Sequence, residues 1–307
     1  MKTEKDKVRG AFLGLAIGDA LGTTLEFKPP GTFTPISDMV GGGPFDLKVG
    51  EWTDDTSMAL CMADSLLECR EMNLADHLHR YTRWWTEGYN SVTGHCFDIG
   101  NTVRTALHNY ACNKTIYAGS DRPMSAGNGS IMRLAPVALY YRKWPIEEAL
   151  LQCAESSRTT HQAPECLIAC RLLGYLMIRA INHTGSIEEL LHISEQDWSI
   201  IDPTDAGPKL RAIAQGSYRD KEPPQIRGTG YVVDSLEAAL WAFAHSHSFE
   251  HGALKAVNLG DDADTTGAVY GQLAGAYYGY QSIPKHWRNK VAWRKRLLKI
   301  ADQLYLK

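Results

Sequence analysis

Long hydrophobic runs are absent from this 307-residue sequence, and no segment approaches the ~18 apolar residues that a helix needs to cross a bilayer. Runs of Lys or Arg are absent as well, and 32 basic against 35 acidic residues leave a net charge of −3. These absences argue against a membrane or a sequence-specific nucleic-acid partner. The apolar segment 11–17 follows Glu4 and Asp6 and runs into Asp19, so it lacks the charge pattern of a signal peptide. We therefore expect a mature, cytoplasmic N-terminus.

The seven cysteines form no CxxC pair, and they are odd in number and scattered along the chain. Cys166 and Cys170 lie one helical turn apart in an apolar segment. This pattern is typical of small buried thiols in a reducing cytoplasm and not of a disulfide framework.

Strict two-residue alternation is nearly absent too, and apolar residues recur instead at three-to-four spacing. The spacing predicts helices over residues 58–67, 74–85, 103–110, 131–141, 146–153, 166–181 and 232–244. The intervening segments 27–52, 113–130 and 216–230 hold most of the Pro and Gly, and none resembles a flexible linker. We predict a single all-α domain over residues 1–307 with roughly a dozen helices.

Two segments carry glycine at every fourth position: residues 10, 14, 18 and 22, and residues 267, 271, 275 and 279. On a helix this spacing makes a groove without side chains, so that another backbone can approach closely. Because each helical glycine costs about 1 kcal/mol relative to alanine, the stripes predict two buried helices with a packing reason for them.

Two acidic clusters each precede a segment with helical character. The first is Thr53-Asp54-Asp55-Thr56, and the second is Asp261-Asp262-Ala263-Asp264-Thr265-Thr266. Either cluster alone could cap a helix. Two clusters of mutually repelling carboxylates, without His or Cys, favour a site for Mg²⁺, Mn²⁺ or Ca²⁺ where both converge. An EF-hand is excluded, because Leu273 stands where that loop needs a bidentate glutamate.

Five motifs in order resemble the ADP-ribosylglycohydrolase family. They are GAFLGLAIGDALG at 10–22, TDDTSMAL at 53–60, FDIGNT at 97–102, AGNGSIMRLAP at 126–136 and NLGDDADTTGA at 258–268. The resemblance implies an all-α orthogonal bundle around a binuclear Mg²⁺ or Mn²⁺ centre. It also implies an enzyme that removes ADP-ribose from modified side chains of a protein.

The resemblance assigns roles to matching positions. It implies that Thr53, Asp54 and Asp55 bind one cation, that Asp262 and Thr265 bind the other, and that Asp264 bridges the two. Glu26 would contact the second cation and swing with substrate. Asp98 and Asn101 would lie beside the ribose, with Asp98 orienting or deprotonating the attacking water. Asp98 could instead cap a helix that starts near Ile99.

The Gly127-Asn128-Gly129 sequence, which we call the GNG turn, offers backbone amides that suit a pyrophosphate. By the resemblance, Ser125 and His161 are further substrate contacts, and Tyr218 and Tyr231 are candidates to stack on adenine. Each could also be a packing residue, His161 and the tyrosines above all.

One departure from the family concerns the acceptor. Arginine-specific members carry an acidic residue close before the GNG turn, where this chain has Pro123-Met124-Ser125-Ala126 and only Asp121 nearby. We still prefer ADP-ribosylarginine as substrate, because the motif set lies nearer the bacterial arginine-directed members. The alternatives are a catalytically silent ADP-ribose-binding homologue and a binuclear phosphoesterase that cuts the pyrophosphate. We expect a monomer.

Overall fold

The computed structural model describes residues 2–307 and contains α-helices and short 3₁₀ helices. Among these residues there is no β-strand, only isolated bridges such as that between Gly127 and Tyr231. The helices are α1 (Glu4–Gly22), η1 (Thr23–Leu25), α2 (Asp54–Cys69), α3 (Leu74–Glu87), α4 (Asn101–Asn113), η2 (Pro123–Ser125), α5 (Ala135–Tyr141), α6 (Ile146–Arg158), α7 (Pro164–Asn182), α8 (Ile187–Leu190), α9 (Glu195–Ile201), α10 (Pro208–Ala214), α11 (Val232–Ala244), α12 (Phe249–Val257), α13 (Ala263–Tyr278), η3 (Tyr280–Ser282), α14 (Lys285–Lys290) and α15 (Arg294–Tyr305). The all-α prediction is confirmed.

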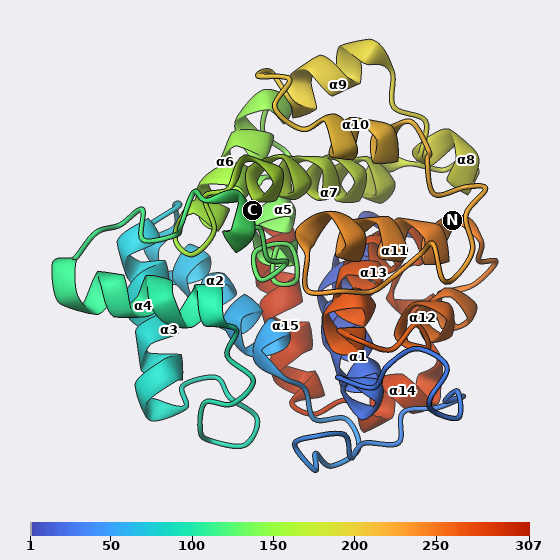
Figure 1. Ribbon diagram of the computed structural model, residues 1–307, viewed down its shortest axis with the longest axis horizontal. Helices are drawn as coiled ribbons and strands as arrows, with labels where there is room; N and C mark the ends of the chain where they lie inside the picture. The colour runs from blue at the N-terminus through green and yellow to red at the C-terminus, as the bar shows by residue number, and fades with distance from the viewer. Residues whose placement is uncertain (1) are drawn as a thin grey trace.

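Helices α1 and α13 pack against each other through the middle of the molecule (Figure 1). A Cβ atom added at Gly14 would collide with the backbone carbonyl of Gly271, and one added at Gly18 would collide with that of Gly267. A Cβ atom added at Gly267 or Gly271 would likewise collide with the carbonyl of Gly18 or Gly14. The two helix backbones therefore interlock in antiparallel register. This close backbone contact explains why glycine recurs at every fourth position in both helices, as the sequence analysis predicts. Gly279 differs, because its φ of +77° ends α13.

The prediction of a helix over 131–141 is wrong at its start, because α5 begins only at Ala135. Pro136 is the reason: a proline in the middle of a helix lacks a backbone donor and clashes with the preceding turn, whereas it fits the first turn. The carbonyls of Ile131 and Met132 instead accept hydrogen bonds from the Gln272 side chain of α13, at 3.0 and 2.9 Å.

Buried apolar side chains from α1 to α15 form a continuous core cluster. The seven cysteines are free, and Cys61, Cys153, Cys166 and Cys170 are buried. Within residues 2–307 no helix combines the length and the apolar character that a membrane span requires. The C-terminal end of α1 and the N-terminal ends of α2 and α13 meet at one place, where the acidic clusters lie.

Candidate metal centre and substrate cavity

Carboxylates from three helices converge around the hydroxyl of Thr53. Thr53 Oγ1 lies 3.0 Å from Asp19 Oδ1 of α1, 3.0 Å from Asp55 Oδ2 of α2 and 2.9 Å from Asp264 Oδ2 of α13. The hydroxyl has one proton, so it can satisfy only one of these three oxygens. The remaining repulsion among fully buried carboxylates needs positive charge to offset it. The two acidic clusters, 211 residues apart, therefore do converge.

Two groups of three carboxylates have the spacing that a metal ion needs. Oxygens of Asp19, Asp55 and Asp264 lie within 4.8 Å of one another, and so do oxygens of Glu26, Asp98 and Asp264. Asp264 belongs to both groups, as a bridging ligand would. Glu26 Oε2, Asp55 Oδ1 and Asp264 Oδ1 are buried without a hydrogen-bond partner. Such orphaned hard oxygens fit divalent cations that prefer oxygen ligands.

Burial and mutual repulsion disfavour the charged forms of these carboxylates. Burial raises the pKa of Asp19 to about 6. Burial and repulsion from Asp264 raise the pKa of Asp262 to about 7 and that of Asp98 to about 9. Burial with neighbouring carboxylates also raises the pKa of Glu26, Asp54, Asp55 and Asp264. Bound cations would reverse this tendency and keep the cluster ionised.

Helix capping does not explain the acidic clusters. Thr53 is the N-cap of α2 and Asp262 is the N-cap of α13, yet neither side chain accepts a capping hydrogen bond. Asp262 Oδ2 instead accepts a hydrogen bond of 2.9 Å from Asn128 Nδ2 of the GNG turn. Asp98 does not cap α4 either, because the N-cap is Gly100. Capping by side-chain hydrogen bonds is therefore excluded, whereas Asp54, Asp55 and Asp264 do lie in the first turns of α2 and α13, where a carboxylate complements the helix dipole.

A cavity of about 480 Å³ opens over the carboxylates. Its lining includes the predicted site residues Glu26, Asp54, Asp98, Asn101, Gly127, Asn128, Gly129, His161, Asp262, Asp264 and Thr265. Thr53 and Asp55 lie fully buried beside it. A second cavity of about 770 Å³ is lined by Tyr231 and shares Gly127 and Gly230 with the first. The two cavities together offer an elongated ligand a path from the carboxylates past the GNG turn.

Two predicted substrate contacts are not in these cavities. Tyr218 is 1% exposed and belongs to the apolar core, so its ring has no free face for stacking, and the prediction for it is wrong. Ser125 ends η2 between lining residues of the second cavity, but it lines neither one. Asp121 is exposed and also lines neither cavity.

His161 is fully buried against the GNG turn and held there by a buried cation. Arg133, 0% exposed, donates to Gly129 O and to Thr160 Oγ1, both at 2.6 Å. Thr160 Oγ1 lies 2.8 Å from His161 Nδ1. Burial and the nearby Arg133 lower the pKa of His161 to about 3, so the ring is neutral. The assignment that gives the Thr160 hydroxyl proton an acceptor has Thr160 donating to Nδ1, and it leaves Nε2–H as a donor next to Gly127 and Gly129.

The comparison with known proteins agrees with this geometry. The family model for ADP-ribosylglycohydrolase matches residues 1–307. This chain belongs to the ADP-ribosylglycohydrolase family. It is 43% identical over 303 residues to the ADP-ribosylarginine hydrolase Tri1 of Serratia proteamaculans (strain 568), covering 98% of this chain and 79% of the relative. It is 32% identical over 290 residues to the ADP-ribosyl-[dinitrogen reductase] glycohydrolase of Rhodospirillum rubrum, covering 93% and 90% of the two chains.

A solved structure described as an ADP-ribosylglycohydrolase-related protein complex superposes with a TM-score of 0.86 at 43% identity. It covers 100% of this chain and 99% of the solved chain. The predicted family and fold are therefore confirmed.

This ADP-ribosylglycohydrolase contains site residues that the sequence analysis missed. Asp19 accepts hydrogen bonds from Thr53 N (2.8 Å) and from Thr56 N and Oγ1 (3.0 and 2.6 Å), which fixes the carboxylate beside the cluster. Its signal is its place in the first glycine stripe, one residue after Gly18. Phe27 and Phe45 line the first cavity, and nothing in their spacing indicates it.

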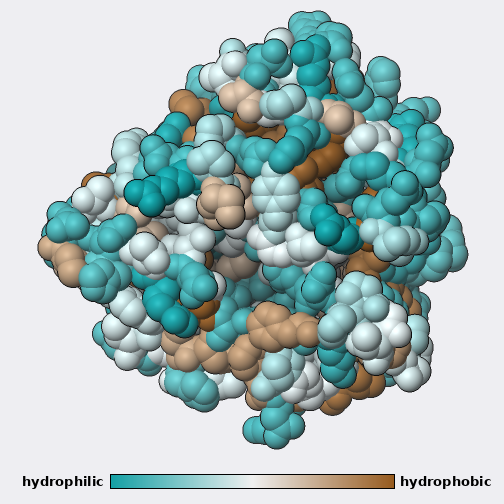
Figure 2. All heavy atoms as spheres, in the orientation of Figure 1, coloured by the Kyte–Doolittle hydropathy of each residue, from teal (hydrophilic) through white to brown (hydrophobic). Residues whose placement is uncertain are grey.

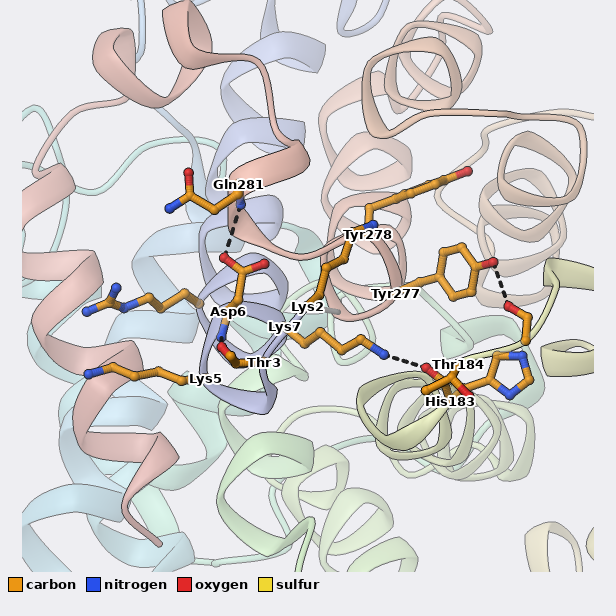
Figure 3. A pocket seen from close by; sticks show the side chains of 12 residues that line it. Lys2, Thr3, Lys5, Asp6, Lys7, His183, Thr184, Tyr277, Tyr278 and Gln281 are labelled. Atoms are coloured by element: carbon orange, nitrogen blue, oxygen red, sulfur yellow. Dashed lines mark hydrogen bonds between the residues drawn. The ribbon is translucent and has the colours of Figure 1, made fainter.

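A further cavity of about 970 Å³ lies at the opposite ends of α1 and α13, and its lining is basic (Figure 3). Two of its cations, Arg9 and Lys7, already have polar partners. Arg9 donates to both carboxylate oxygens of Asp302, at 2.6 and 2.7 Å, and Lys7 donates to two backbone carbonyls at the end of α7. Among the described residues one carboxylate, Asp6, lines it. The chemistry of the family therefore belongs to the acidic cavity.

Proposed function

We propose that this chain is a metal-dependent hydrolase that releases ADP-ribose from ADP-ribosylated arginine side chains of a protein. The observation that carries the proposal is the sharing of Asp264 by two carboxylate groups below a cavity that the GNG turn borders. The relatives named as arginine hydrolases supply the acceptor.

The residues divide naturally between two Mg²⁺ or Mn²⁺ sites. Thr53, Asp54, Asp55 and Asp19 would hold one cation; Glu26, Asp262 and Thr265 would hold the other; and Asp264 would bridge them. Two such cations supply Lewis acidity to a water and to the ribose hydroxyls.

The side chains at the floor of the cavity perform the remaining steps. Asp98, whose carboxylate lies near that of Glu26, would accept a proton from the attacking water. Positive charge that develops on the ribose during bond cleavage is stabilised by the surrounding carboxylates. Asn101 lines the same cavity and would contact the ribose.

The rest of the substrate would follow the two cavities. The GNG turn presents backbone amides, and His161 presents its Nε2–H, to the anionic pyrophosphate. Tyr231 lines the second cavity and would stack on adenine. Its hydroxyl donates a hydrogen bond of 2.6 Å to Glu165, and the Lys209 ammonium lies over the ring, 5.0 Å from its centroid, so adenine would take the opposite face.

The test is release of ADP-ribose from defined substrates. The protein is incubated with Mg²⁺ or Mn²⁺ and peptides that carry ADP-ribose on arginine or on serine, and the products are separated by chromatography. We expect free ADP-ribose from the arginine-linked peptide and none after chelation of the metal. AMP as product would instead indicate a phosphoesterase, and no product with tight ADP-ribose binding would indicate a silent homologue.

A further inference from the structure

Phe27 combines an exposed ring with an uncommon backbone conformation at the mouth of the acidic cavity. Its φ is +60° and its side chain is 63% exposed. Left-handed backbone is unfavourable for a bulky residue, and exposure brings the ring no burial energy. An exposed aromatic ring that also lines the cavity is available to a ligand.

The backbone of Phe27 is fixed to the loop that carries the metal ligands. Phe27 N donates to Asp261 O at 2.7 Å, and Asp261 N donates to Lys28 O at 2.9 Å. Asp261 directly precedes Asp262, and it is itself left-handed with φ +57°. These hydrogen bonds therefore fix the position of Phe27 relative to Asp262, and the chain itself fixes it relative to the preceding Glu26.

Phe27 is the first of three rings in a row. The centroids of Phe27 and Phe45 are 6.3 Å apart with the rings at 74°, and those of Phe45 and Phe97 are 5.1 Å apart at 58°. Phe27 and Phe45 line the cavity, while Phe97 supports Phe45 from behind and directly precedes Asp98. Figure 2 shows apolar surface along the lower edge of a central hollow, where Figure 1 places the segments leading into α2 and α4.

The expected path of the substrate through the two cavities leaves the side with Phe27 and Phe45 for the acceptor, the side chain from which ADP-ribose is released. The pyrophosphate and adenosine would follow the GNG turn toward Tyr231 and the second cavity, on one side of the carboxylates. The group bonded to the other face of the ribose must then leave the cavity along a different wall. Among the remaining residues that line the first cavity, Phe27 and Phe45 present aromatic rings and Asp98 presents a carboxyl group, a combination that suits a departing guanidinium.

We propose that Phe27 and Phe45 form the binding site for the acceptor guanidinium, which stacks on their rings beside the acidic lining of the cavity. This inference rests on the proposed hydrolysis of ADP-ribosylarginine and names the specificity element of that site. A planar, weakly hydrated cation gains from aromatic faces, whereas a serine hydroxyl gains nothing comparable. Arginine-specific members of the family carry an acidic residue just before the GNG turn, which this chain lacks. Phe27 and Phe45 would provide the selectivity for an arginine acceptor in its place.

The experiment compares Phe27→Leu and Phe45→Leu with Phe27→Tyr and Phe45→Tyr. Leucine keeps the apolar bulk and removes the aromatic face, while tyrosine keeps the face. We expect each leucine variant to raise KM for an arginine-linked peptide, lowering kcat/KM about fivefold, with the tyrosine variants near wild type. Inhibition by free ADP-ribose, which has no acceptor, should stay unchanged in all four. Val40→Ala, an exposed apolar residue on the same loop outside the cavity, is the matched control.

The outcomes separate this inference from the proposed function. If wild type cleaves the arginine-linked peptide and the leucine variants match it, the guanidinium site is refuted and the hydrolase stands. If the leucine variants lose serine-linked and arginine-linked turnover equally, the rings do not select the acceptor, and the inference is refuted as well. If wild type releases no ADP-ribose from arginine, the proposed function itself fails.

Discussion

Replacing Gly271 by alanine probes the interlocked contact between α1 and α13. The added Cβ would collide with the carbonyl of Gly14 and lie 2.5 Å from its carbon. Both atoms belong to helix backbone, so no side-chain rotation can relieve the overlap. Overpacking a core typically costs about 1–3 kcal/mol, and alanine returns about 1 kcal/mol through its helix propensity. Because the obstacle is rigid, we expect the upper part of that range, a net loss of about 2 kcal/mol in the free energy of unfolding.

Thermal unfolding in the metal-free protein measures this loss as a fall in Tm of roughly 3 °C. The matched control is Gly174→Ala in α7, where the new Cβ would lie 2.7 Å from Cys153 Sγ, a side-chain atom that can move. Both variants gain the same helix propensity, so the difference between them isolates the backbone collision. Gly271→Ala should also bind Mn²⁺ less tightly, because α13 carries Asp264. A Tm for Gly271→Ala at or above that of Gly174→Ala would refute the reasoning.

Three further substitutions test the centre. Asp264→Asn removes the carboxylate shared by both groups and should abolish binding of both cations in calorimetry, together with activity; retention of one tight site would contradict its bridging role. Asp98→Asn should keep the metals and ADP-ribose affinity while turnover falls by more than about tenfold, and turnover within about threefold of wild type would show that Asp98 is no base. Thr160→Val breaks the link from Arg133 to His161 and should weaken ADP-ribose binding about tenfold, with Thr160→Ser close to wild type. Nitrogen NMR of the His161 ring should show the Nε2–H tautomer in wild type and its loss in the valine variant, whereas unchanged spectra would refute the assigned tautomer.

The two acidic clusters could be recognised from the sequence as one candidate metal site because their signal is local. TDDT and DDADTT place several carboxylates within a few residues, and a fold has little reason to collect like charges twice without a cation. Asp19 has no such signal. A single aspartate within a helix is common, and only the approach of α1 to α13 brings it to the cluster.

The roles of the aromatic residues, by contrast, could not be predicted from the sequence. Whether a tyrosine or phenylalanine is buried or lines a cavity depends on contacts far away in the sequence, so Tyr218 and Tyr231 could not be separated by pattern. Tyr218 is enclosed by the core, while Tyr231 borders a cavity. Phe27 depends on a left-handed turn at a residue type that rarely adopts one, which no propensity would predict.

The glycine contact and the metal centre are two parts of one arrangement. Asp19 lies in the last turn of α1 and Asp264 in the first turn of α13, so the distance between their carboxylates follows from how closely the glycine-bearing backbones approach. Close approach forces buried like charges together, which opposes folding unless the carboxylates are protonated or cations bind. Cations that bind only the folded arrangement therefore stabilise it by mass action. The residues that bring the two helices together would thus also set the affinity of the candidate metal site, although the glycines themselves have no side-chain ligand atom to offer.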